Sequence, residues 1–129
     1  MSVYTKVVDV LSESLAVEPG AVTPESNLLT DLGAESIDLL DVVFRLEREF
    51  GIEIPRGELF PDFLFRNTGD FVEDGRLTDA GRRQVAEAFP FIDTSALGHA
   101  TEPRELFTVD LLAAYVDWKV AQVAPDGAA

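Results

Sequence analysis

The sequence predicts an all-α protein in which the helices form an up-and-down bundle. Apolar residues recur at helical spacing in three well-separated stretches, whereas strand signals are confined to short segments. The 129 residues include no cysteine, so neither disulfides nor a thiolate zinc site can take the place of a hydrophobic core. Apolar side chains make up 47% of the chain, which is sufficient for a core in one domain of this length.

The first helix is expected from about Ser2 to Ala16, and Pro19 and Gly20 follow it as stop signals. Its apolar residues recur three and four positions apart: Val3, Val7, Val10, Leu11 and Leu15. A long connection then runs from residue 21 to residue 35. Four apolar residues should hold this connection against the bundle: Val22, Leu28, Leu29 and Leu32.

The second helix is expected to begin at Ser36 and to end near Phe50, with Gly51 as its C-terminal stop. The line predicted to face the core consists of Leu39, Val43, Leu46 and Phe50. Beside this line lie three further apolar residues, Ile37, Leu40 and Phe44. The opposite stripe, predicted to face solvent, consists of Asp38, Asp41, Arg45 and Arg48.

The segment from residue 56 to residue 105 has a less regular pattern. The Asp74-Gly75 pair is typical of a tight hairpin turn, and Thr78 or Asp79 can cap a short helix that continues to about Ala88. A last amphipathic helix opens at Thr108. It carries Val109, Leu112, Val116 and Val120 along one face.

This pattern predicts a single domain over residues 1–129. Residues 1–55 and 106–123 would form the bundle, residues 56–105 a largely helical insertion between the second and last helices, and residues 124–129 a frayed tail.

Charge and hydropathy restrict the function classes. Twenty-four acidic against ten basic residues give a net charge of −14, which disfavours nucleic acid and anionic membranes and suits basic protein surfaces. Neither a signal peptide nor an apolar run long enough to span a bilayer is evident. We expect a cytoplasmic monomer that binds other proteins.

Ser36 is the candidate residue for chemistry, because it lies where a glycine-containing loop becomes a helix. Its hydroxyl can cap that helix by accepting a hydrogen bond from a backbone N–H. Alternatively, it is an exposed alcohol that can be esterified, and a phosphodiester would then lie at a helix N-terminus, where free N–H groups favour negative charge. The residues alone leave both interpretations open.

The stretch Asp31-Leu32-Gly33-Ala34-Glu35-Ser36-Ile37-Asp38 resembles the phosphopantetheine attachment motif of acyl carrier proteins. The first helix, the long loop, the second helix and the last helix resemble the same family, although Glu35 and Ile37 replace its usual Asp and Leu. The resemblance implies that a phosphopantetheinyl transferase attaches 4′-phosphopantetheine from coenzyme A to Ser36.

The resemblance also implies a carrier that catalyses nothing itself. An acyl-loading ligase or transferase and synthase-type enzymes with basic docking surfaces would act on the arm, in fatty-acid, lipid or polyketide-type biosynthesis. Four acidic residues match positions where the family meets these partners: Glu35, Asp38, Asp41 and Glu47. No catalytic constellation and no complete set of metal ligands is evident, and the single His99 lies in an irregular segment.

Two departures from the family bear on partner choice. Arg45 and Arg48 place positive charge on a helix that the family keeps acidic; they either reject some partners or form an ordinary solvated face. The predicted insertion is rich in large apolar residues: Phe60, Phe63, Leu64, Phe65, Phe71, Phe89 and Phe91. These residues either enlarge an acyl-binding cavity or dock a partner, or they give the insertion its own small core.

Two rival functions remain open from the sequence. The first is a peptidyl or aminoacyl carrier of a natural-product pathway. The second is an interaction protein that has the fold but uses Ser36 only as a helix cap.

Overall fold

The computed structural model describes residues 2–61, 71–92 and 102–123. The chain is mostly helical with one small sheet, which confirms the predicted fold class. In chain order the elements are α1 (Val3–Leu15), the 3₁₀ helix η1 (Pro19–Ala21), α2 (Ser36–Phe50), β1 (Val72–Glu73), β2 (Arg76–Leu77), α3 (Asp79–Ala88), the 3₁₀ helix η3 (Pro103–Leu106) and α4 (Val109–Val123). None of the helices in the described ranges is long and apolar enough to cross a membrane.

The helix boundaries follow from local capping chemistry. The Ser2 hydroxyl oxygen accepts a hydrogen bond from the Thr5 amide at 3.1 Å, so α1 begins at the next residue after this cap. Gly51 ends α2 with a left-handed φ of 64°, which costs glycine little because it lacks a Cβ. The predicted limits of the second helix are therefore confirmed.

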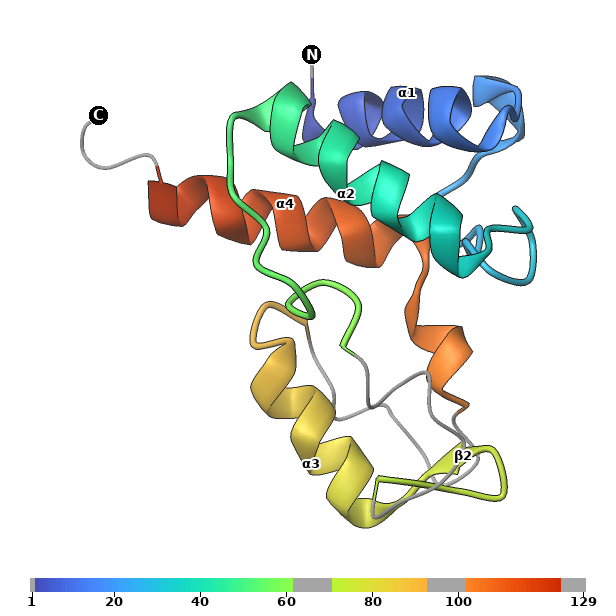
Figure 1. Ribbon diagram of the computed structural model, residues 1–129, viewed down its shortest axis with the longest axis vertical. Helices are drawn as coiled ribbons and strands as arrows, with labels where there is room; N and C mark the ends of the chain where they lie inside the picture. Colours follow the sequence, from blue (N-terminus) through green and yellow to red (C-terminus); the bar gives the residue numbers. More distant parts are fainter. Residues whose placement is uncertain (1, 62–70, 93–101, 124–129) are drawn as a thin grey trace.

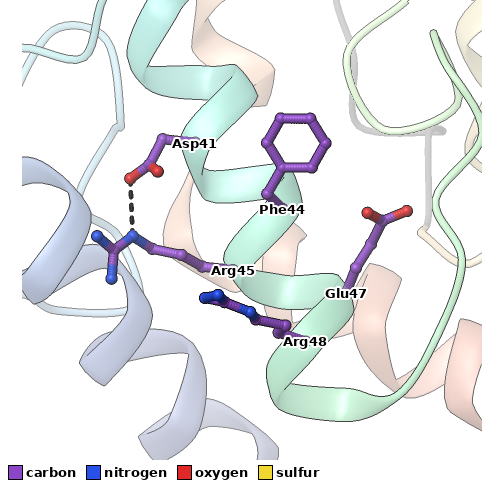
Figure 2. Close-up of a pocket in the computed structure, with 5 residues that line it drawn as sticks. All are labelled: Asp41, Phe44, Arg45, Glu47 and Arg48. Atoms are coloured by element: carbon purple, nitrogen blue, oxygen red, sulfur yellow. Dashed lines mark hydrogen bonds and ion pairs between the residues drawn. The ribbon is translucent and has the colours of Figure 1, made fainter.

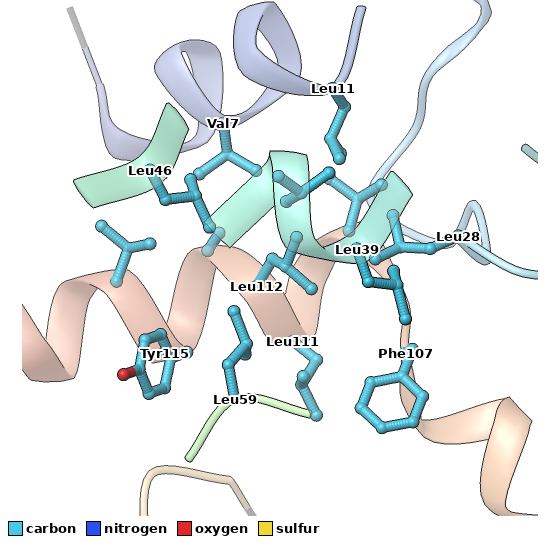
Figure 3. Close-up of a cluster of buried hydrophobic side chains, with 14 of the residues drawn as sticks. Val7, Leu11, Leu28, Leu39, Leu46, Leu59, Phe107, Leu111, Leu112 and Tyr115 are labelled. Carbon is cyan, nitrogen blue, oxygen red and sulfur yellow. The ribbon is translucent and has the colours of Figure 1, made fainter. Parts of the chain in front are cut away.

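Helices α1, α2 and α4 lie together at one end of the molecule, and α3 with the hairpin lies at the other end (Figure 1). The bundle core consists mostly of aliphatic side chains from all three helices and from the loop before α2, together with the aromatic Phe107 and Tyr115 (Figure 3). Its fully buried members include Val7, Leu11, Leu28, Val42, Leu46, Leu112 and Val116. Burial of Val22 and Leu28 confirms that the long connection is held on the bundle by its apolar residues.

The predicted hairpin and capped helix are both present in the insertion. Asp74 and Gly75 adopt positive φ values of 53° and 77° at the turn between β1 and β2. The Thr78 hydroxyl oxygen then accepts a hydrogen bond from the Gly81 amide at 3.0 Å and caps α3. Gly81 packs so closely on the preceding chain that an added Cβ would lie 2.1 Å from the carbonyl oxygen of Phe71.

The aromatic residues of the insertion pack on the same core as the bundle. The ring of the buried Phe107, just before α4, lies 5.3 Å from that of Phe60 and 6.5 Å from that of Phe89. Phe91 lies 5.6 Å from Tyr115 of α4. The described aromatics therefore continue the bundle core and do not form a separate one; Phe63, Leu64, Phe65, His99 and the predicted tail lie outside the described residues.

A polar contact also fastens the segment after α2 to α4. The Glu58 carboxylate accepts hydrogen bonds from the Tyr115 hydroxyl and, at 2.7 Å, from the Lys119 ammonium group. Burial of Tyr115, reinforced by the Glu58 carboxylate, raises the pKa of its hydroxyl well above the ordinary value.

Candidate functional site

Buried Asn27 anchors the loop that leads to Ser36. Its side-chain oxygen accepts hydrogen bonds from the amides of Leu29 and Thr30 at 2.9 and 3.1 Å, and its side-chain nitrogen donates to the carbonyl oxygen of Arg104 at 2.8 Å. The Asp31 carboxylate accepts from the Asn27 amide at 2.8 Å. One polar side chain thus satisfies backbone groups of the loop and of a segment far along the chain.

The same loop satisfies amides at the start of α4. The Val109 amide donates to the carbonyl oxygen of Ser26 at 2.9 Å, and the Asp110 amide donates to that of Pro24 at 3.0 Å. The first amides of a helix have no partner within the helix, so these loop carbonyls replace the missing ones. The loop before α2 and the beginning of α4 therefore stabilise each other.

The last turn of the loop brings the chain into α2. The Ala34 amide donates to the carbonyl oxygen of Leu28 at 2.8 Å, and the Ala34 side chain is buried. Gly33 adopts a φ of 72°, in the left-handed region that favours glycine. Together these features place Ser36 at the first helical position, facing solvent.

The N-cap of α2 is Glu35, not Ser36. The Asp38 carboxylate accepts a hydrogen bond from the Glu35 amide at 2.9 Å, as in a capping box. The Ser36 hydroxyl makes no hydrogen bond with any residue that the structure describes. Ser36 is therefore not the N-cap of α2, and no described residue engages its hydroxyl.

Two of the four predicted partner-binding acids are committed within the bundle. Asp41 Oδ2 accepts a hydrogen bond from the Ser14 hydroxyl at 2.6 Å. It also accepts one from Arg45 Nε at 2.7 Å (Figure 2). These bonds, first that of Ser14 and then that of Arg45, hold the pKa of the Asp41 carboxyl below its ordinary value. The Glu47 carboxylate accepts from the Ile54 amide at 2.8 Å.

Asp38 and Glu35 form the capping box of α2, and Glu35 is the most exposed of the four predicted acids. The two arginines differ as well. Arg45 donates to Asp41 and, at 3.1 Å, to Glu13, so its charge is balanced by two carboxylates. Arg48 is exposed and forms no ion pair with any residue in the described ranges.

Three apolar residues of α2 point away from the core, contrary to the sequence interpretation that placed them beside it. Ile37, Leu40 and Phe44 are 71%, 61% and 64% exposed. A helical projection of the sequence could have found them, because the residues that α2 does bury, Leu39, Val42 and Leu46, lie on the opposite side of the helix. Phe44 borders a surface pocket that is also lined by Asp41, Arg45, Glu47 and Arg48 (Figure 2).

These features define a class of protein: a small helical bundle that presents a free serine hydroxyl at the first turn of a helix. Among the described residues no group of three or more His, Asp or Glu side chains could hold a metal ion. Residues 5–71 match the family model described as "Phosphopantetheine attachment site". The chain belongs to this family of phosphopantetheine-binding carriers.

The similar curated proteins are acyl carrier proteins. The chain is 48% identical over 74 residues to "Acyl carrier protein" of Campylobacter hominis, a match that covers 57% of this chain and 94% of that one. It is 44% identical over 52 residues to "Acyl carrier protein AcpXL" of Rhizobium etli, covering 40% of this chain and 56% of the relative. The chain thus spans little more than half the length of the AcpXL relative.

The family implies a covalently attached 4′-phosphopantetheine group, and the residues present fit it. Ser36 is exposed and its hydroxyl has no hydrogen-bond partner among the described residues, so esterification would break no hydrogen bond within that part of the chain. The first amides of α2 and the helix dipole favour the negative charge of a phosphodiester at this position.

Proposed function

We propose that the chain is an acyl carrier protein that holds thioester-linked acyl intermediates on a 4′-phosphopantetheine arm esterified to Ser36. One observation carries the proposal: within the matched segment, Ser36 occupies the first helical position, is exposed and has no hydrogen-bond partner among the described residues, while Glu35 and Asp38 do the capping. The pathway would be fatty-acid, lipid or polyketide-type biosynthesis.

The residues around Ser36 support its modification because they fix its position at the surface. Asn27 and Gly33 fix the loop, and the capping box fixes the first turn, so Ser36 Oγ is presented at a constant place on the surface. When bound, the arm supplies the thiol that carries the acyl group. In the attachment step, Ser36 Oγ forms a bond to the pantetheine-bearing phosphorus of the pyrophosphate of coenzyme A, and the pyrophosphate P–O bond breaks. Adenosine 3′,5′-bisphosphate leaves, and the transferase accepts the hydroxyl proton.

The partners would be a phosphopantetheinyl transferase, an acyl-loading ligase or transferase, and synthase-type enzymes. The net charge of −14 supports long-range attraction to enzymes with basic surfaces. Residues 1–55 and 106–123 would act as the carrier bundle, and the insertion would extend it within one domain. The chain itself would catalyse no step.

The test is intact mass after co-expression with a broad-specificity phosphopantetheinyl transferase. The parent should gain the mass of one phosphopantetheine, and Ser36→Ala should gain none. Ser2→Ala is the matched control, because Ser2 is also an exposed serine at a helix start, and it should be modified like the parent.

An unmodified parent, with the transferase active on a control carrier and the chain folded by circular dichroism, would contradict the proposal. Once the arm is attached, loading with fatty acids and with amino acids separates an acyl carrier from an aminoacyl carrier.

A further inference from the structure

Phe107 contacts two regions of the chain at once. Its carbonyl oxygen accepts a hydrogen bond at 2.9 Å from the amide of Leu28, in the loop that leads to Ser36 (Figure 3). Its ring is fully buried and packs on the rings of Phe60 and Phe89 of the predicted insertion, at centroid distances of 5.3 and 6.5 Å. A shift of the insertion that moves this ring therefore also moves a hydrogen-bond partner of the loop.

Asn27 is a second link between the same two regions, and its side chain uses different atoms for local and for distant contacts. The side-chain oxygen accepts from the amides of Leu29 and Thr30, which lie within the loop. The side-chain nitrogen donates to the carbonyl oxygen of Arg104 at 2.8 Å, 77 positions along the chain. Because Asn27 is only 7% exposed, water has little access to these groups if the distant bond is lost.

The hydrogen bonds of the loop continue toward Ser36. The carbonyl oxygen of Leu28 accepts from the amide of Ala34 at 2.8 Å, and the buried Ala34 precedes Ser36 by two residues. A continuous series of bonds therefore runs from residues 104–107 through Asn27 and Leu28 to the turn that presents Ser36.

We propose that Asn27 is a positioning residue for attachment of the arm, and that the predicted insertion controls this attachment from a distance through residues 104–107. The inference rests on the proposed carrier function. A transferase that accepts only the anchored loop binds the chain more weakly in proportion as the anchored fraction falls. In the bound complex the loop is anchored, so loss of the link should raise KM for the chain and leave kcat unchanged.

The substitution Asn27→Asp removes the distant contact and keeps the local ones. Aspartate has nearly the same shape, and its carboxylate can still accept from the two loop amides, but the ionised group cannot donate to the carbonyl oxygen of Arg104. Two acceptors would then face each other at a buried site, which disfavours the anchored loop. The control is Thr30→Asp, which adds the same charge at an exposed position of the same loop.

The experiment measures KM and kcat separately, with a purified phosphopantetheinyl transferase and the apo chain as the varied substrate. Asn27→Asp should raise KM by about tenfold, the size expected for a buried polar group left unsatisfied, while kcat stays close to that of the parent. Thr30→Asp should stay close to the parent in both. Circular dichroism and the thermal midpoint verify the fold of each variant, and the assay temperature lies well below every midpoint.

Three results would overturn the positioning role of Asn27. The first is an unchanged KM for the folded Asn27→Asp variant. The second is an equal rise of KM for Thr30→Asp, which would assign the effect to charge alone. The third is a lower kcat at unchanged KM, because it would place the effect in the chemical step and not in the anchored fraction of the loop.

The role of the insertion is tested with Phe89→Leu, which removes a ring beside Phe107 and keeps an apolar side chain. KM should rise by about fivefold, at the lower end of couplings between distant sites. The amides of Leu28 and Ala34 should exchange faster with deuterium. The control is Gly81→Ala, which disturbs α3 against the hairpin but removes no ring beside Phe107, and it should change neither quantity.

An unchanged KM for Phe89→Leu, or exchange of the two loop amides at the rate of the parent, would overturn the control by the insertion. Failure of the transferase to modify the parent at Ser36 is a different result, because it would remove the carrier function and this inference with it. Hydrogen exchange requires no transferase, so in that case it still measures whether the loop and the insertion are coupled.

Discussion

In the bundle, α1, α2 and α4 bury aliphatic lines from residues that recur at helical spacing. The predicted insertion has no comparable line of buried aliphatic residues in its described part. Its helix α3 buries only Gly81 and Val85, and its sheet has two residue pairs. What holds it is the close approach of Gly81 to the hairpin and the packing of Phe60, Phe89 and Phe91 on the bundle. In the part of the chain that the structure describes, the predicted insertion therefore adds aromatic side chains to the bundle core and forms no separate core.

The largest loss of stability is expected from truncating Phe107, which packs between the bundle and the predicted insertion. Phe107 is fully buried and packs on the rings of Phe60 and Phe89, so Phe107→Ala should lower the free energy of unfolding by about 3–5 kcal/mol. Chemical denaturation measures this change. Phe44→Ala removes the same group from an exposed site and should cost little; equal effects of the two variants would contradict the shared core.

A smaller effect confined to the insertion is expected from Gly81→Ala. The new Cβ would meet the backbone carbonyl of Phe71, which cannot move without shifting the hairpin, at a cost of about 1–3 kcal/mol. Hydrogen exchange should accelerate in α3 while α1 and α2 keep their protection, and Ser36 should still be modified. The control is Gly20→Ala, because no atom lies within 4 Å of a Cβ at Gly20.

The smallest effect is expected at Asp41 in the bundle, whose contribution to stability depends on pH. The Ser14 hydroxyl and Arg45 lower the pKa of Asp41 in the folded chain, so the ionised carboxylate stabilises the fold above the ordinary Asp pKa of about 3.9. The thermal midpoint of Asp41→Asn should lie slightly below the parent near neutral pH. This difference should vanish as the pH falls through the lowered pKa.

A control is needed because any lost acid relieves repulsion in a chain with a net charge of −14. Asp9→Asn, at an exposed position of α1, measures that general effect. A midpoint difference for Asp41→Asn that matches the control at every pH would contradict the stabilising role of Asp41.

Sequence reasoning succeeded where short-range physics decides the structure. The limits of α2, the turn at Asp74 and Gly75, and the Thr78 cap follow from glycine conformation and hydroxyl capping within a few residues. The position of Ser36 at the start of a helix follows in the same way.

Sequence reasoning failed where distant parts of the chain decide. Asn27 bonds to Arg104, and no local pattern marks that contact. That Asp38, Asp41 and Glu47 meet a partner stays a prediction, although each of them accepts a hydrogen bond from a group of the chain itself. The exposure of Phe44 is a different case, because the residues that α2 buries, among them Val42, lie on the opposite side of the helix and a helical projection could have shown this.

The contact between Asn27 and Arg104 also sets an order of events during synthesis. The loop before α2 also receives anchors from residues 104–110, more than seventy positions later in the chain. On the ribosome, the serine emerges long before the segment that fixes its loop. A transferase that requires the anchored loop would act only after residues 104–110 have been synthesised and have bonded to it. Attachment of the arm would then mark chains that have already folded.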